Sequence, residues 1–191
     1  MKRLILLLAS TFLIFNLSNA VTYNSDPKIF ISELASDAIK ILSDKSTSKD
    51  EKSKSIEKIA LKNVDIEALG LYSLGSIRKT LKSEELEKYN FLFEKYLLKN
   101  LTSRLSDYSS SQFKVTGSEQ KSSNTTIVTS KIEGTDNQPA INIDWRVYTK
   151  DPAKPLIRDL IVEGLSLART QKEEFASILN SNNNDINLLI T

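Results

Sequence analysis

The stretch that decides the fold is residues 141–148, which read INIDWRVY. Apolar side chains alternate here with polar or charged ones, so a β-strand over 140–149 would carry one apolar and one polar face. Runs rich in β-branched residues predict three more strands, over 112–116, 125–132 and 156–163. Short links of turn-forming residues separate the four runs, which favours an antiparallel sheet over a parallel one.

Helical periodicity precedes the strands. Asp26 is a typical N-cap residue and Pro27 suits a first helical position, so a helix is expected over 26–42. A polar connection over 43–55 leads into a second helix. Asp65 is expected to cap a short third helix.

A long helix is predicted to begin at Ser83, because a hydroxyl followed by two glutamates suits the positive end of the helix dipole. Apolar side chains continue at helical spacing to Tyr108, over an arc wide enough to need more than one packing partner. The last helix, over 166–180, has Ser166 as its cap. Helices segregated from an antiparallel sheet make the expected fold class α+β.

The composition excludes most familiar enzyme chemistry. The 191 residues include no Cys and no His, which removes thiol nucleophiles, disulfides, Cys/His zinc sites and histidine triads. Asp144, Asp159 and Glu163 lie on consecutive strands and could be considered for acid–base work. The alternation places Asp144 and Asp159 opposite the apolar face, toward solvent. We therefore expect no catalytic residue, no cofactor and no metal.

The N-terminus is typical of a cleavable signal peptide. A basic start precedes an apolar run over 4–17, and residues 18–20 offer small side chains for cleavage after Ala20. The run is shorter than the roughly 20 residues that span a bilayer, so an uncleaved anchor is the weaker alternative. We expect export of a single domain, residues 21–191. Its acidic and basic side chains balance, which argues against nucleic acid as a partner.

Three segments carry a resemblance to a known family: residues 143–148 (IDWRVY), 157–167 (IRDLIVEGLSL) and 175–179 (FASIL). Together with the opening 27–30 (PKIF) and 64–66 (VDI), their order and spacing resemble the MlaC family. These are periplasmic phospholipid-binding proteins of the Mla lipid-asymmetry system, also called toluene-tolerance auxiliary proteins.

Two positions depart from the family pattern. Lys154-Pro155-Leu156 stands where the family usually has a Gly-x-Trp turn, and Pro fixes φ and removes a donor there. Gln171-Lys172 stands where a Tyr-Arg pair is common. This second change keeps the charge but loses the planar fork that arginine offers to an anion.

The resemblance implies a curved antiparallel four-stranded sheet, wrapped by N-terminal helices and a C-terminal helix around a deep apolar pocket. The pocket would hold the acyl chains of a phospholipid and leave its head group in solvent. Two chains of roughly sixteen carbons cost on the order of 25 kcal/mol to expose to water, at about 0.8 kcal/mol per methylene. A soluble carrier must therefore line a cavity with apolar side chains.

The candidate lipid-binding side chains are the apolar ones of the sheet face and of the helices expected to surround it. They are Leu71, Leu74, Ile77, Phe93, Tyr96, Leu97, Ile143, Trp145, Val147, Leu160, Val162, Leu167 and Phe175. The alternative for each is that it packs in the protein's own core, since apolar alternation is the usual signature of a core.

By resemblance, the protein is a periplasmic carrier and not an enzyme. Its partners would be a phospholipid, an outer-membrane lipoprotein–porin complex and an inner-membrane ABC transporter with a substrate-binding ring, and the carrier would be a monomer. Two alternatives remain open: a periplasmic interaction or chaperone module without an enclosed pocket, and a small isomerase-like enzyme.

Overall fold

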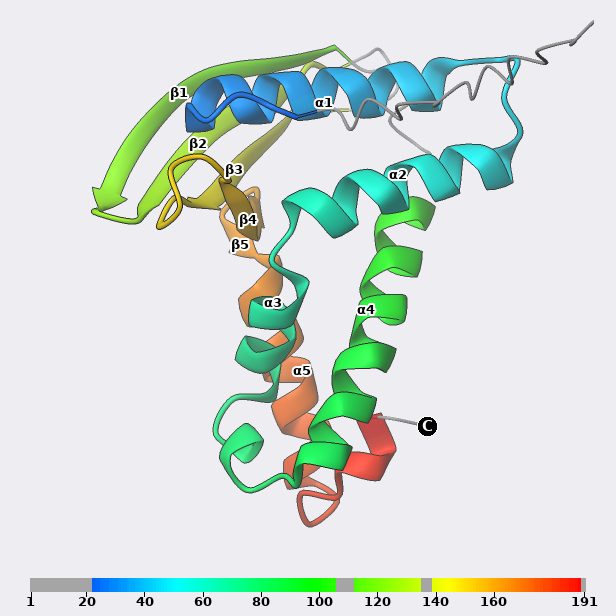
Figure 1. The fold of residues 1–191 in the computed structure, drawn as a ribbon, viewed down its shortest axis with the longest axis vertical. Coiled ribbons are helices and arrows are strands. Elements are labelled where there is room, and N and C mark those ends of the chain that lie inside the picture. The colour runs from blue at the N-terminus through cyan, green and yellow to red at the C-terminus, as the bar shows by residue number, and fades with distance from the viewer. Residues whose placement is uncertain (1–21, 106–111, 135–138, 190–191) are drawn as a thin grey trace, which may run out of the picture.

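The computed structural model describes residues 22–105, 112–134 and 139–189, and its fold is α+β, as predicted (Figure 1). The signal peptide expected at 1–20, the helical position of Tyr108 and the turn residues 135–137 lie outside the described part. The elements in chain order are α1 (Pro27–Ser43), α2 (Lys49–Asn63), α3 (Ile66–Leu74), η1 (Ile77–Lys79), α4 (Ser83–Leu105), β1 (Phe113–Ser122), β2 (Thr125–Ile132), β3 (Ile141–Tyr148), β4 (Leu156–Val162), β5 (Leu165–Ser166), α5 (Leu167–Asn180) and η3 (Ile186–Leu189).

The helices begin at the predicted capping residues. Asp26 accepts hydrogen bonds from two backbone N–H groups of the first turn of α1, at 2.9 and 3.0 Å. Asp65 accepts one from α3 at 3.3 Å, and Ser166 accepts one from α5 at 3.1 Å. Each side chain satisfies donors that have no partner within the helix itself. The long helix α4 begins at Ser83, as expected.

The second helix begins earlier than predicted. The polar stretch over 43–55 was expected to be a connection, but α2 starts at Lys49. Ser48 and Glu51 form a capping box: the Ser48 hydroxyl accepts from the Glu51 N–H, and the Glu51 carboxylate accepts from the Ser48 N–H. This reciprocal pair stabilises a helix start whose exposed side chains show no apolar periodicity.

The sheet is antiparallel in the order β1-β2-β3-β4-β5, with one strand more than predicted. The extra strand, β5, follows a tight reversal in which Glu163 and Gly164 have φ of 49° and 80°. Both residues adopt the left-handed region, so the chain turns back at once and β5 pairs with β4. With two residues, β5 is too short to show alternation, which explains why the sequence did not predict this strand.

The first strand is longer than predicted. Gly117-Ser118 was expected to link two strands, but both residues lie within β1. The register with β2 shifts between Val115 and Gly117, so the glycine marks a β-bulge instead of a turn. The link to β2 comes at residues 123–124.

The described residues form two hydrophobic cores. In the sheet core, Phe30, Ile31 and Leu34 of α1 pack on Val128, Val147 and Ile157 of the sheet. The helical core joins α3, α4 and η3 with the end of α2 and part of α5; its buried members are Ala60, Ile66, Leu74, Tyr89, Phe93, Leu98 and Ile186. Figure 1 shows α1 lying across the sheet, while α3, α4 and α5 extend away from it. The helices were expected to wrap the sheet, but most of them build this second core.

A short joint connects the two cores. Val64 packs against both of them and forms a bridge with Ile157 of β4. The next N–H, that of Asp65, donates to the Ile157 carbonyl at 2.9 Å. Arg158 Nε then donates to Asp65 Oδ2 at 2.7 Å. The start of α3 is thus fixed to β4 by backbone and side-chain bonds.

Candidate functional site

Most of the predicted lipid-binding residues contribute to the two cores. Leu74 and Phe93 are buried in the helical core. The sheet core contains Val147, which has no exposed surface, with Trp145 and Leu160 packed against it. Ile77, Leu97 and Phe175 are half-buried and pack against the helical core. For these eight residues the structure provides protein neighbours, so their apolar character already has a structural reason.

The other predicted residues belong to neither core. They are Leu71, Tyr96, Ile143, Val162 and Leu167. Leu71, Ile143 and Val162 are half-buried, while Tyr96 and Leu167 are exposed over 44% and 43% of their surface. Apolar side chains left outside a core are the ones available to an apolar ligand.

The strand register brings several of these residues together. Ile143 of β3 pairs with Val162 of β4, and Val162 pairs with Leu165 of β5. Residues paired in this way share one face of an antiparallel sheet. Leu165 was not predicted as a site residue, and it is the most exposed large apolar side chain described, at 64%. The signal that could have identified it is the Glu163-Gly164 turn directly after a strand, because such a reversal pairs Leu165 with Val162.

The predicted residues Leu167 and Tyr96 lie on helices α5 and α4. Leu167 opens α5 two residues after Leu165, and Gln171 follows one helical turn later on the same flank. Tyr96 of α4 donates its hydroxyl to Gln171 Oε1 at 2.8 Å. We call the set Ile143, Val162 and Leu165, which the strand register places on one face, the open apolar surface.

The polar groups beside the open apolar surface are already bonded within the protein. The Trp145 indole donates to Ser130 Oγ at 2.8 Å, and Ser130 Oγ donates to the Ile143 carbonyl at 3.0 Å. Phe113 packs edge-on against the Trp145 ring, 6.1 Å between ring centroids. This part of the sheet face therefore offers mainly apolar contact, because its hydroxyl and indole have partners.

Asp159 does not meet solvent as expected. Its side chain lies opposite the apolar face, but the start of α5 covers it, leaving the residue only 6% exposed. It accepts hydrogen bonds from Ser166 Oγ at 2.6 Å and from the Ala168 N–H at 3.0 Å. Arg146 Nε lies 3.7 Å from the same carboxylate. Asp159 therefore anchors α5 to the sheet and stabilises the positive end of that helix.

Several ionisable side chains of the helices have partners within the protein. The described residues hold no group of acidic side chains that could bind a metal ion. Burial raises the pKa of the Tyr89 phenol well above its ordinary value, and its hydroxyl donates to the Gly70 carbonyl, so this group stays protonated. Two cations of α5 have partners: Lys172 Nζ lies 5.1 Å from the centre of the Tyr72 ring, and Arg169 Nε lies 3.9 Å from Glu173 Oε1.

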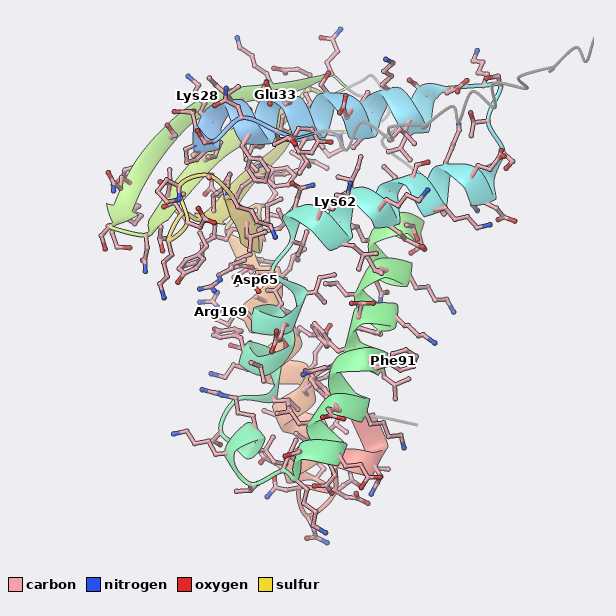
Figure 2. All side chains as sticks on the ribbon, in the orientation of Figure 1. Lys28, Glu33, Lys62, Asp65, Phe91 and Arg169 are labelled. Carbon is pink, nitrogen blue, oxygen red and sulfur yellow. The ribbon has the colours of Figure 1, made fainter. Side chains whose placement is uncertain are left out.

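The other exposed aromatic side chain of α4 faces elsewhere. Figure 2 shows Phe91 directed away from α3 and α5, on the outer side of the helix. Lys95 Nζ lies 4.0 Å from the centre of its ring. Phe91 is therefore separate from the open apolar surface. In the described ranges, none of the helices combines the length and apolar character needed to cross a membrane.

These observations define the class: an α+β protein whose antiparallel sheet keeps an apolar surface outside its two cores. The model of the MlaC protein family matches residues 32–191, so the chain belongs to the MlaC family. Among curated proteins, no sequence matches the chain.

A solved structure shares the fold. It is that of a phospholipid-binding protein from Ralstonia solanacearum in complex with a phospholipid. The match covers 83% of this chain and 92% of that chain, with a TM-score of 0.70 and 15% sequence identity.

Proposed function

We propose that this protein is a soluble periplasmic carrier that binds a phospholipid and shuttles it between membrane complexes of an Mla-type system. The observation that carries the proposal is the open apolar surface, which continues the sheet face beyond the sheet core to β5. Membership of the MlaC family and the phospholipid in the Ralstonia solanacearum relative support a lipid as the ligand.

The acyl chains would lie along the open apolar surface, with the head group toward solvent. Ile143, Val162 and Leu165 provide adjacent apolar contacts on three strands. Burial of apolar surface drives the binding and contributes about 25 cal/mol of free energy per Å² buried. No covalent step is involved, so the protein acts as a carrier and not as an enzyme.

The partners proposed for the carrier are an outer-membrane lipoprotein–porin complex and an inner-membrane ABC transporter with a substrate-binding ring. Transfer takes place at a docked complex. Otherwise the acyl chains would be exposed to water, at a free-energy cost of about 0.8 kcal/mol per methylene. The carrier works as a monomer, residues 21–191, after cleavage of the signal peptide behind Ala20. The partners set the direction of transfer, because a binding surface by itself favours neither direction.

The test is organic extraction of the purified protein followed by mass spectrometry. We expect about one diacyl phospholipid per chain in the wild type. Ile143→Glu should retain little or no lipid while remaining folded, because the new carboxylate lies on the open apolar surface and would be desolvated by the acyl chains. Circular dichroism checks the fold of the variant.

The matched control is Ile127→Glu. Ile127 is also half-buried, but its register partner is Arg146, so it lies on the opposite face of the neighbouring strand. This variant should retain lipid like the wild type. Absence of lipid from gently prepared wild-type protein would contradict the carrier and favour an interaction module without a lipid site.

A further inference from the structure

The turn between β4 and β5 carries an unusual residue. Glu163 and Gly164 form a two-residue hairpin loop, and both have positive φ, 49° and 80°. Such loops favour Asn, Asp or Gly at the first position, because most other side chains are strained in the left-handed region. The other described non-glycine residues with positive φ are two asparagines, Asn183 and Asn184. A glutamate in this turn therefore needs a reason other than its backbone preference.

The Glu163 side chain has a specific partner on β3. The Glu163 N–H donates to the Asn142 carbonyl at 3.0 Å. In a regular antiparallel pair, the Asn142 N–H would donate in return to the Glu163 carbonyl. Instead it donates to the Glu163 carboxylate, at Oε1. The side chain thus replaces the main-chain acceptor, which lets the backbone leave the β3–β4 ladder at this residue and reverse.

The place of the reversal decides which face of the sheet Leu165 occupies. With the turn at residues 163–164, Leu165 pairs with Val162, which in turn pairs with Ile143. Successive residues of a strand point to opposite faces, so a reversal one residue later would move Leu165 off this face. Leu165 is 64% exposed, so packing within the protein does not by itself hold it there.

We propose that Glu163 is a positioning residue for lipid binding: its carboxylate, bonded to Asn142, fixes the reversal that keeps Leu165 on the open apolar surface. The inference rests on the proposed function, because it concerns the lipid bound at that surface. Glu163 acts through Leu165 and does not itself contact the acyl chains. A carboxylate that only stabilised the fold would change the melting temperature and leave the lipid affinity unchanged.

Trp145 provides the readout for the experiment. It is the only Trp of the chain, and it lies on β3 two residues from Ile143, on the same face. Its register partner, Leu160, lies two residues from Val162 on β4. An acyl chain on the open apolar surface thus adjoins the indole, and bromine atoms on that chain quench the indole fluorescence.

The probe is dibromostearoyl phosphatidylglycerol. The purified protein is incubated with increasing amounts of vesicles of this lipid, and the vesicles are then removed. The quenching of Trp145 gives the relative lipid affinity, and mass spectrometry counts the lipid that stays with the protein. Thermal melts of the same samples give the stability of each variant.

The variants separate the carboxylate from the backbone. Leu165→Ala should weaken the lipid affinity on the order of tenfold. Glu163→Gly removes the acceptor but suits the left-handed backbone, so it should weaken the affinity roughly three- to tenfold while melting no lower than Glu163→Ala. Glu163→Gln keeps an oxygen acceptor and should stay within about twofold of the wild type. Combining Glu163→Gly with Leu165→Ala should bind no more weakly than Leu165→Ala alone.

The matched control is Asn184→Gly. It makes the same kind of change at a comparable φ, 60°, in the turn between α5 and η3. In the described structure, the Asn184 N–H donates to the Leu179 carbonyl of α5, at 2.8 Å. Because this bond lies within the α5 end of the molecule, the variant should keep the wild-type lipid affinity.

Several outcomes would overturn the role of Glu163 while the carrier stands. One is wild-type affinity in Glu163→Gly, and another is an affinity of Glu163→Gln as low as that of Glu163→Gly. A double variant weaker than Leu165→Ala by the full factor of Glu163→Gly would overturn it too, because Glu163 would then not act through Leu165. If the wild type neither shows quenching nor retains lipid, the proposed function fails together with this inference. Should Glu163→Gly not fold, Glu163→Ala supplies the same comparison with Glu163→Gln.

Discussion

The two ends of the apolar sheet face differ in what covers them. At one end, α1 places Phe30 and Ile31 over Val147, which has no exposed surface. At the other end, Ile143 and Val162 carry the same kind of side chain on the same strands but belong to neither core. The comparison teaches that an alternating strand can serve a core over half its length and remain available to a ligand over the rest.

The largest expected effect comes from a charge at the covered end. Val147→Glu places an unpaired carboxylate under α1, at a cost of about 5 kcal/mol, which is comparable to the whole stability of a small domain. We expect a largely unfolded protein in urea titrations followed by circular dichroism. A folded Val147→Glu protein would mean that α1 does not close this end of the face.

A milder comparison truncates one side chain at each end. Phe30→Ala should reduce the free energy of unfolding by about 3 kcal/mol or more, because the core cannot refill the lost volume. Leu165→Ala should change it by no more than about 0.5 kcal/mol, since that side chain is largely exposed. Chemical denaturation measures both. Similar losses in the two variants would contradict the difference between the ends.

The attachment of α5 to the sheet depends on Ser166, which directly follows Leu165 of the uncovered end. Ser166→Ala removes the helix cap and the hydrogen bond to Asp159, and should cost about 1–2 kcal/mol. Thr170→Ala is the control, because the Thr170 hydroxyl bonds only the helix backbone in the described structure. Thermal melts of both variants test this, and a stability for Ser166→Ala equal to that of Thr170→Ala would refute the anchoring role.

The smallest effect is expected in the turn between α1 and α2. Hydrogen bonds from Ser46 and Thr47 lower the pKa of Asp44 from 3.8 to about 2. The stabilisation from Asp44 is therefore complete above pH 3.8 and is lost as the pH falls toward 2. Asp44→Asn should melt slightly below the wild type at neutral pH, and the two should converge near pH 2. An Asp44 NMR titration midpoint near its ordinary value would contradict this.

Local rules predicted much of the fold. The caps at Asp26, Asp65 and Ser166 were predictable because each rests on a side chain and an amide two or three residues away. Gly117 was misread because a bulge and a turn use glycine in the same way, and only the partner strand distinguishes them. The helix start at Ser48 was missed because an exposed helix start lacks apolar periodicity.

The candidate site was less predictable. Alternation identified the apolar face, but Val147 and Ile143 are equivalent in sequence, and the position of α1 alone separates them. Asp159 was expected in solvent because alternation defines a face without stating what covers it. Tyr96 was proposed as a pocket residue, but its bond to Gln171 joins positions 75 residues apart and has no local signal.

The bridge between Val64 and Ile157 has a consequence for the order of folding. Both cores depend on late parts of the chain: the sheet core needs Ile157, and the helical core needs Ile186. A chain truncated before β4 lacks both residues, however many helices it has already formed. The protein should therefore acquire its stability in a single late event, and its amino-terminal half should remain sensitive to proteases until synthesis is complete.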